Sequence, residues 1–205
     1  MMVLRESGYV AVPWKNGGGL TREILRVPPE PVPFEWRLSL ATIDRAGPFS
    51  AFAGYRRTLV LVRGAGVELR FTRPATPASA AEAEPARLRL DTVGQVARFD
   101  GGWETSCTLL DGPSTDLNLI VSELQADSQS RSIDLRGRES IQTGSWTETL
   151  VCCISGSVTL TNTTGRTLDL APVDVARCAP EDGAITCEPG KGSAAVLFVA
   201  QLRKI

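Results

Sequence analysis

The sequence predicts an all-β protein built from two small antiparallel β-barrels in tandem. Short runs rich in β-branched and aromatic residues recur between turn signals, and no long stretch has helical periodicity. One pattern of strands also returns in the second half of the chain. At 205 residues the chain is long enough to bury a core without a metal ion or disulfide bonds.

The expected strands alternate with turn signals along nearly the whole chain. Gly64–Gly66, Ser155–Gly156 and Asn162–Gly165 predict hairpin turns between successive runs. An Ala- and Pro-rich tract at 73–87 has no periodicity and predicts a mobile surface loop. The runs predicted as strands are 34–43, 57–64, 67–71, 86–90, 95–99, 104–110, 115–121, 146–156, 157–162, 166–170, 174–178, 184–188 and 194–202.

An internal repeat suggests how the chain divides into domains. TLVLVRGAGVELRF (58–71) resembles TLVCCISGSVTLTN (149–162), and VGQVARF (93–99) resembles PVDVARC (172–178). We therefore expect an N-terminal barrel over 1–125 and a C-terminal barrel over 126–205. Polar residues suited to a pocket gather in the first half, so the C-terminal barrel is expected to act as a scaffold.

Charge and hydropathy exclude several classes of protein. Lys and Arg number 22 and Asp and Glu number 23, so no basic excess points to a nucleic-acid partner. No apolar run approaches the roughly 20 residues of a membrane helix, and the start of the chain lacks the apolar core of a signal peptide. We expect a cytoplasmic protein without a nucleic-acid or membrane partner. Whether it forms a homodimer stays open.

The chain contains no histidine, which removes much enzyme chemistry. Ser-His-Asp and Cys-His catalysis and nearly all histidine-based metal centres are excluded. The five cysteines form no CxxC pair, so we expect buried free thiols in a reducing compartment. We expect no cofactor and no metal ion, and the balance is against an enzyme.

Polar side chains on apolar strands are the main candidates for a site. Alternation places Arg37 and Ser39 on one face of the strand at 34–43, and Asp116 and Asn118 on one face of the strand at 115–121. If these faces line a barrel, they form either a pocket or a structural brace in which the polar groups satisfy one another. A solvated face is the alternative. Arg57 follows an aromatic stretch that contains Phe49, and its planar guanidinium suits a carboxylate.

The stretch PWKNGGGLTREI (13–24) has three consecutive glycines between polar residues. Glycine permits close backbone approach, and successive N–H groups can hold an anion. The stretch fits neither a Walker A loop nor a dinucleotide-binding loop. The alternative is a turn that leads into a strand, with Arg22 and Glu23 paired to each other.

Four stretches together resemble signature blocks of the HutD/Ves family: 13–24, WRLSLATI (36–43), GPFSAFAGYRRTLVLVRG (47–64) and DGPSTDLNLIVSE (111–123). The resemblance implies a two-cupin (bicupin) fold and a bacterial protein that binds a small intermediate of histidine utilisation and restrains that pathway, with no established enzyme activity. The positions that match the family blocks are Trp14, Asn16, Gly19, Thr21, Arg22, Glu23, Trp36, Arg37, Ser39, Ala41, Phe49, Ser50, Phe52, Gly54, Arg57, Asp116 and Asn118.

Residues and resemblance together suggest a pocket for a small carboxylate, with urocanate and formiminoglutamate as candidates from the resemblance. Arg22, Arg37 and Arg57 would hold the carboxylate. A lyase, isomerase or hydrolase that uses Glu23 or Asp116 as a base is the enzymatic alternative, although nearby arginines are expected to lower the pKa of such a carboxyl. The candidate ligand-binding residues are Asn16, Gly18, Gly19, Thr21, Arg22, Glu23, Arg37, Ser39, Phe49, Arg57, Asp116 and Asn118.

Overall fold

The computed structural model describes residues 1–14, 17–29, 33–72 and 86–205. Asn16 and all but the last two residues of the Ala- and Pro-rich tract (73–87) lie outside these ranges. In the described ranges the regular structure is β-strand, apart from two single 3-10 turns, η1 (Glu6–Gly8) and η2 (Pro180–Asp182). The all-β class predicted from the sequence is confirmed.

The chain forms two compact units. The N-terminal unit is Val10–Leu124, and the C-terminal unit combines Met1–Tyr9 with Gln125–Ile205. The sequence division at 125/126 assigned the first nine residues to the first domain. In the structure β1 (Met2–Leu4) instead pairs with β17 (Val175–Cys178), which places these residues in the C-terminal unit.

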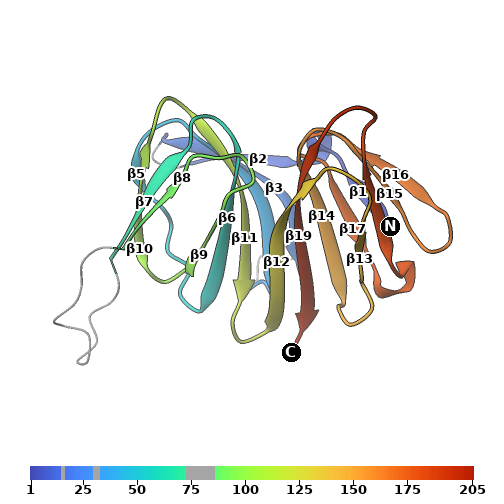
Figure 1. Cartoon of the computed structure of the whole chain (residues 1–205). Coiled ribbons are helices and arrows are strands. Elements are labelled where there is room, and N and C mark those ends of the chain that lie inside the picture. The colour runs from blue at the N-terminus through green and yellow to red at the C-terminus, as the bar shows by residue number, and fades with distance from the viewer. Residues whose placement is uncertain (15–16, 30–32, 73–85) are drawn as a thin grey trace. The chain divides into compact units, whose positions relative to one another are not determined.

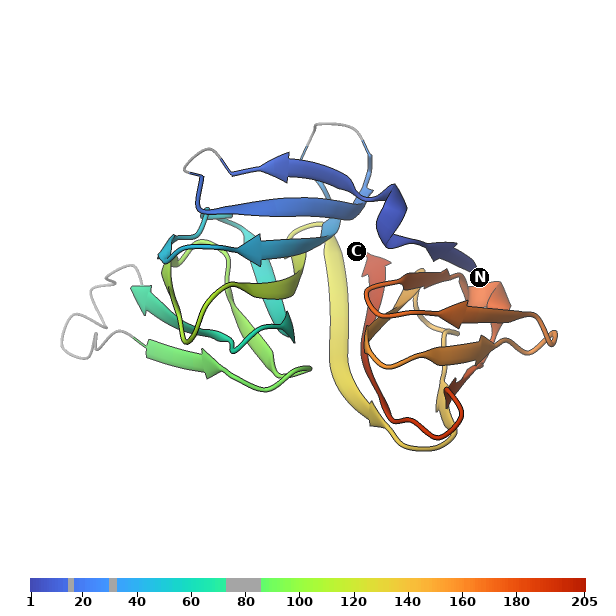
Figure 2. The same cartoon turned by 90° about the horizontal axis from the view of Figure 1, so that it is seen from above.

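The N-terminal unit consists of two antiparallel sheets, which lie opposite each other in Figure 2. Its six-stranded sheet has the order β2 (Val10–Pro13), β3 (Gly19–Val27), β4 (Trp36–Ile43), β11 (Ser114–Ser122), β6 (Tyr55–Arg63) and β9 (Val96–Asp100). Its four-stranded sheet has the order β5 (Gly47–Pro48), β10 (Glu104–Leu109), β7 (Val67–Thr72) and β8 (Ala86–Leu90) (Figure 1).

The C-terminal unit also consists of two antiparallel sheets. The five-stranded sheet has the order β1, β17, β14 (Glu148–Ser155), β19 (Ala195–Lys204) and β12 (Ala126–Leu135). The four-stranded sheet has the order β13 (Glu139–Ile141), β18 (Ile185–Pro189), β15 (Val158–Thr161) and β16 (Thr167–Leu170).

The two units share one strand order, as the sequence repeat predicts. The series β4-β11-β6-β9 corresponds to β12-β19-β14-β17, and β5-β10-β7-β8 corresponds to β13-β18-β15-β16. The N-terminal unit adds β2 and β3 beside β4. These two strands come from the stretch that contains the three glycines.

The repeat extends to the backbone of one turn. Gly94 has a φ of 85° and its N–H donates to the carbonyl of Leu61, while Val173 has a φ of 67° and its N–H donates to the carbonyl of Cys153. A positive φ is costly for a β-branched residue, so the hydrogen-bonded turn imposes this conformation on Val173.

Two of the predicted hairpin turns are wrong. The turns at 64–66 and 155–156 lead from one sheet to the other, because β6 and β7, like β14 and β15, belong to different sheets. Gly66 (φ 103°) is required at the first corner, since an added Cβ would lie 1.9 Å from the carbonyl oxygen of Leu90. Only the turn at 162–165 joins paired strands, β15 and β16.

Each unit has an apolar core between its sheets. The cluster around Leu59, Leu69 and Phe71 fills part of the N-terminal unit, and the cluster around Val151, Leu160 and Leu197 fills the C-terminal unit. All five cysteines are free and buried, as predicted, and burial raises the pKa of the Cys107 thiol to about 12. No helix in the described ranges is long and apolar enough to span a membrane.

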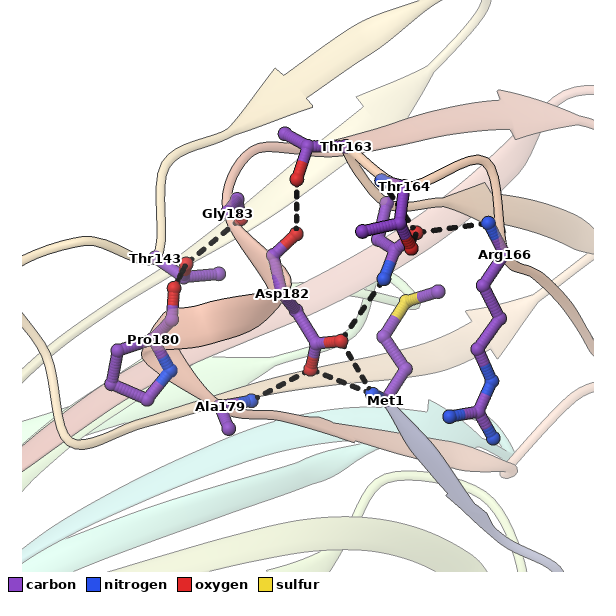
Figure 3. A network of polar contacts seen from close by, with 10 residues as sticks. Met1, Thr143, Thr163, Thr164, Arg166, Ala179, Pro180, Asp182 and Gly183 are labelled. Atoms are coloured by element: carbon purple, nitrogen blue, oxygen red, sulfur yellow. Dashed lines mark hydrogen bonds and ion pairs between the residues drawn. The ribbon is translucent and has the colours of Figure 1, made fainter.

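A polar network organises one end of the C-terminal unit around Asp182 (Figure 3). The carboxylate of Asp182 accepts hydrogen bonds from the amino group of Met1, the backbone N–H of Ala179 and the side-chain amide of Asn162. These donors lower the pKa of Asp182 against the opposing effect of burial. The network is internally satisfied, so we interpret it as structural.

Candidate ligand-binding site

A cavity of about 710 Å³ lies within the N-terminal unit, on the inner face of its six-stranded sheet. Polar and aromatic side chains share its wall, as expected of a site for a small polar ligand. The lining residues are Val12, Pro13, Trp14, Thr21, Glu23, Arg26, Arg37, Ser39, Ala41, Pro48, Phe49, Ser50, Phe52, Arg57, Asp116 and Asn118.

The strand register arranges the polar side chains in three rows across the sheet. The outermost row contains Arg26, Arg37, Ile120, Arg57 and Phe99 on neighbouring strands. Side chains in directly paired positions lie on the same face, so the arginines of this row converge on one end of the cavity.

The other two rows lie progressively further along the strands. The middle row contains Glu23, Ser39, Asn118 and Leu59. The third row contains Thr21, Ala41, Asp116 and Leu61. The cavity therefore has arginines at one end, an aspartate at the other, and a serine and an asparagine between them.

Aromatic rings contact the guanidinium groups of Arg37 and Arg57. The Cζ atom of Arg57 lies 5.1 Å from the ring centroid of Phe49 and 5.2 Å from that of Phe99. The Cζ atom of Arg37 lies 5.1 Å from the ring centroid of Phe52, and the Cζ atom of Arg57 lies 5.6 Å from the same centroid. Cation–π contacts orient a guanidinium without neutralising its charge.

Neither of these arginines has a carboxylate partner within ion-pair distance in the described ranges. Arg57 is 4% exposed and donates one N–H to the carbonyl of Ser50 at 3.2 Å. Burial lowers its pKa to about 10, with Asp116 opposing and Arg37 adding to this effect. Burial likewise lowers the pKa of Arg37. Both side chains remain cationic near neutral pH and retain N–H groups for an anion.

Arg26 differs from these two because it has a carboxylate partner. Its Nε atom lies 3.4 Å from Glu23 Oε2, and its Cζ atom lies 4.8 Å from the ring of Phe34. The pair is partly exposed, so its contribution to stability is small. Its main electrostatic effect is to balance one arginine against one glutamate at the cavity wall.

Several buried polar atoms in the cavity have no hydrogen-bond partner among the described residues. They are Arg37 Nε, Ser39 Oγ, Arg57 Nε, Asp116 Oδ1 and Asn118 Oδ1. A buried polar atom without a partner costs about 1–3 kcal/mol. Proteins retain such groups where water or a ligand satisfies them, so this cluster makes the cavity a candidate binding site.

Asp116 is 2% exposed, and its pKa is higher than expected for a carboxyl near arginines. Burial raises its pKa to about 7, although Arg57 and its own backbone N–H act in the opposite direction. The predicted effect of the arginines is present, since Arg57 lowers this pKa, but desolvation outweighs it because the guanidinium does not contact the carboxyl.

The structure brings most of the predicted site residues together. Thr21, Glu23, Arg37, Ser39, Phe49, Arg57, Asp116 and Asn118 line the cavity. Gly18, Gly19 and Arg22 do not. Arg22 pairs with Leu40, whose side chain is on the opposite face of the sheet from Ser39, so β3 turns Arg22 away from the cavity. Asn16 lies outside the described residues.

The glycines shape the cavity indirectly. Gly17 has a φ of 65° in the turn that precedes β3. An added Cβ at Gly19 would lie 2.3 Å from the carbonyl oxygen of Thr42 and 3.2 Å from the ring of Trp14. The bare backbone lets Trp14 lie against β3, where its Nε1 donates to Thr21 Oγ1 at 2.8 Å.

Arg26 is the charged lining residue that sequence reasoning missed. The other lining residues outside the predicted site set are Val12, Pro13, Trp14, Ala41, Pro48, Ser50 and Phe52. Simple alternation from Thr21 and Glu23 would place residue 25 in the cavity. A bulge between Glu23 and Leu25 shifts the register, so that Arg26 instead pairs with Arg37. The sequence GLTREILRV contains no turn residue that marks this bulge.

The corresponding row of the C-terminal unit has a different character. Gln129, Gln201, Thr149 and Cys178 occupy the positions that match Arg37, Ile120, Arg57 and Phe99. Gln201 accepts from Gln129 and donates to the carbonyl of Gln142 at 2.6 Å. Glutamine and threonine thus stand where the N-terminal unit has Arg37 and Arg57, and the two glutamines of the row bind each other.

The cavity lacks the side chains of a histidine-based metal centre, since the chain has no histidine. Among the described residues, no cluster of three or more Cys, Asp or Glu side chains is arranged to hold a metal ion. The donor set of guanidinium, hydroxyl, amide and carboxyl groups suits an organic anion better than a transition metal.

Two relatives are similar in sequence to part of this chain. A 21.2 kDa uncharacterised protein of the hutC 3' region of Pseudomonas putida is 39% identical over 123 residues, which is 60% of this chain and 58% of that protein. Protein Ves of Citrobacter koseri is 46% identical over 56 residues, 27% of this chain and 29% of that protein. These matches thus span well under two thirds of either relative.

Solved structures match over almost the whole chain. HutD from Pseudomonas fluorescens SBW25 superposes with a TM-score of 0.80 at 29% identity, covering 100% of this chain and 98% of that one. A conserved protein of unknown function from Pseudomonas aeruginosa PAO1 gives 0.81 at 29% identity, with 98% of both chains covered.

A more distant similarity concerns the fold alone. Oxalate decarboxylase of Lactobacillus farciminis gives a TM-score of 0.67 at 9% identity, covering 100% of this chain and 87% of that one. The all-β fold is therefore cupin-like. The sequence profile of the HutD family matches residues 6–197, and the chain belongs to the HutD family.

Proposed function

We propose that this protein is a metal-free, two-cupin sensor that binds a small carboxylate metabolite and regulates histidine utilisation. The observation that carries the proposal is the pair Arg37 and Arg57. Aromatic rings orient both guanidinium groups at one end of a cavity, and neither has a carboxylate partner among the described residues. A bound carboxylate would satisfy both charges through charge-assisted hydrogen bonds.

The polar groups of the cavity favour this proposal over a structural brace. A brace requires that the arginines, Asp116 and Asn118 satisfy one another. Instead Arg57 Nε, Asp116 Oδ1 and Asn118 Oδ1 lack partners within the described part of the chain. Such an arrangement is unfavourable for stability and is explained by a binding role.

The similar proteins support the choice of ligand class and pathway. The P. putida relative is named for the hutC 3' region, and the structure of HutD from P. fluorescens is that of a formate condition. Formate is the smallest carboxylate. Among intermediates of histidine utilisation, urocanate and formiminoglutamate each carry a carboxylate and are the candidate ligands. Binding would act through sequestration of the ligand or through ligand-dependent contact with a protein partner.

The test is thermal unfolding of the purified protein with urocanate, formiminoglutamate, histidine, glutamate, formate and phosphate. A ligand that binds the native state raises the free energy of unfolding by about 2.7 kcal/mol at 100 times its Kd. We expect a concentration-dependent rise in Tm for at least one carboxylate and none for phosphate. A flat response to every carboxylate would contradict the proposal.

One observation favours an enzymatic alternative in which Asp116 acts as a base. A buried carboxyl whose pKa lies at about 7 can exchange a proton near neutral pH. Incubation of the same carboxylates with wild-type protein and with Asp116→Asn would reveal turnover by changes in ultraviolet absorption or mass. Turnover that the variant loses while still binding the carboxylate would establish the enzyme; stable compounds would exclude it.

A further inference from the structure

The cavity carries opposite charges at its two ends. Arg57 pairs in register with Ile120, and Asp116 lies four residues further along the same strand, β11. At about 3.3 Å per residue, the two rows are about 13 Å apart along the strand. Arg57 and Asp116 influence each other's pKa, yet no ion pair joins them in the described ranges.

The two rows beyond the arginines are rich in hydrogen-bond acceptors. Asp116 Oδ1, Asn118 Oδ1 and Ser39 Oγ are buried and have no partner among the described residues. The exposed fractions of these side chains are 2%, 7% and 1%. An ionised carboxylate accepts hydrogen bonds only, and a serine hydroxyl can accept as well. When Asp116 is ionised, a ligand group that donates hydrogen bonds can satisfy all three of these atoms.

We propose that the ligand is dipolar, with a carboxylate at Arg37 and Arg57 and an N–H donor group, such as an imidazole or amidine, at Asp116, Asn118 and Ser39. This inference rests on the proposed carboxylate site and adds the chemistry of the ligand's other end. Asp116 then determines specificity. In its ionised form it disfavours compounds that present an acceptor, because such a compound leaves a buried carboxylate without a partner.

The two ends make separate contributions to affinity and can be tested separately. Urocanate and 3-(2-furyl)acrylate share a carboxylate and a five-membered ring, but only urocanate has a ring N–H. Formiminoglutamate and glutarate form a second pair, in which only the first has an amidine. Binding of all four compounds is measured by calorimetry on the wild type, Asp116→Asn, Arg57→Ala and Asp111→Asn. Asp111 is exposed and outside the cavity lining, so it is the matched control.

For the wild type we expect the donor-bearing member of at least one pair to bind at least tenfold more tightly than its partner. Asp116→Asn should reduce that preference to less than threefold while it preserves the affinity for the donor-free member. Arg57→Ala should weaken both members of the pair, and Asp111→Asn should change neither. Tm of each variant establishes that it is folded.

The outcomes separate the two proposals. Equal binding of both members of every pair, or a preference unaffected by Asp116→Asn, would contradict the proposal of a dipolar ligand. Neither result would contradict the proposed carboxylate site. Binding that Arg57→Ala leaves unchanged, or no binding by any of the four compounds, overturns the carboxylate site and this inference with it.

Discussion

Arg57 is the residue on which the proposed carboxylate site depends most. Its side chain is nearly buried, contacts three aromatic rings and keeps its Nε without a partner in the described ranges. The rings compensate for burial without competing for the N–H groups. The side chain is therefore prepared for an anion before any anion arrives, which lowers the cost of ordering on binding.

We expect Arg57→Ala to weaken carboxylate binding by about 1.5–3 kcal/mol, the loss of a charge-assisted hydrogen bond. Titration calorimetry with whichever carboxylate stabilises the wild type measures this. Arg56→Ala is the control, because Arg56 is the exposed neighbour on the same strand with its side chain on the other face. Equal affinity in wild type and Arg57→Ala would remove Arg57 from the site.

Asp116 makes the stability of the unliganded protein depend on pH. Its pKa rises from 3.8 to about 7 on folding, so the native state binds more protons than the unfolded state between these values. Stability therefore falls as pH rises from about 4 to about 7. The facing groups are Arg57, which remains charged below its pKa of about 10, and Cys107, which remains neutral below about 12.

The pH effect is measured as Tm of the wild type relative to Asp116→Asn between pH 5 and pH 8. We expect the wild type to lose stability relative to the variant as pH increases, because asparagine carries no charge to bury. Parallel curves for the two proteins would mean that Asp116 has an ordinary pKa or that another group compensates for it.

At the scale of elements, β3 positions one side of the cavity through two local features. Gly19 allows close contact with Thr42 and Trp14, and the bulge after Glu23 directs Arg26 inward. Both features act on backbone geometry, so substitutions there affect the cavity without touching a lining side chain.

Gly19→Ala tests this role of β3. An added Cβ meets the backbone of β4, which has to move, and overpacking of this kind costs about 1–3 kcal/mol. We expect a lower Tm and weaker carboxylate binding. Gly8→Ala is the control, since nothing lies within 4 Å of a Cβ there and φ is not positive. If Gly19→Ala matched Gly8→Ala in both measurements, β3 would not require close packing at this point.

At the scale of the molecule, the two units share one strand order but differ in whether their inward-facing polar groups have hydrogen-bond partners. The inner amide row of the C-terminal unit is internally satisfied, whereas the cavity of the N-terminal unit contains unsatisfied polar atoms. The same type of substitution should therefore have opposite effects in the two units, because removal of a paired polar group leaves its partner unsatisfied while removal of an unpaired one does not.

We compare Gln201→Leu with Asn118→Leu by urea unfolding and calorimetry. Gln201→Leu should lower the free energy of unfolding by about 1–3 kcal/mol, because Gln129 and the carbonyl of Gln142 lose their partner. Asn118→Leu should leave stability unchanged or raise it, but it should weaken the binding of a carboxylate that also carries an N–H donor. If Asn118→Leu destabilised as strongly as Gln201→Leu, Asn118 would be a structural brace.

Patterns along the chain, together with the family resemblance, were sufficient to predict the all-β class, the repeated unit and half of the residues that line the cavity. Alternation alone assigned Arg37 with Ser39, and Asp116 with Asn118, to shared faces, because side chains of a strand alternate strictly while the pairing is regular. The absence of histidine made a histidine-based metal centre impossible without any knowledge of the fold.

The register and the burial of these residues could only come from the tertiary structure. A bulge that no turn residue marks places Arg26 rather than Leu25 in the cavity wall, and sheet-to-sheet corners replaced two predicted hairpins. The raised pKa of Asp116 was not predicted because it depends on desolvation and on the distance to Arg57, and neither quantity is local in sequence. Pairing across strands distant in the chain sets both.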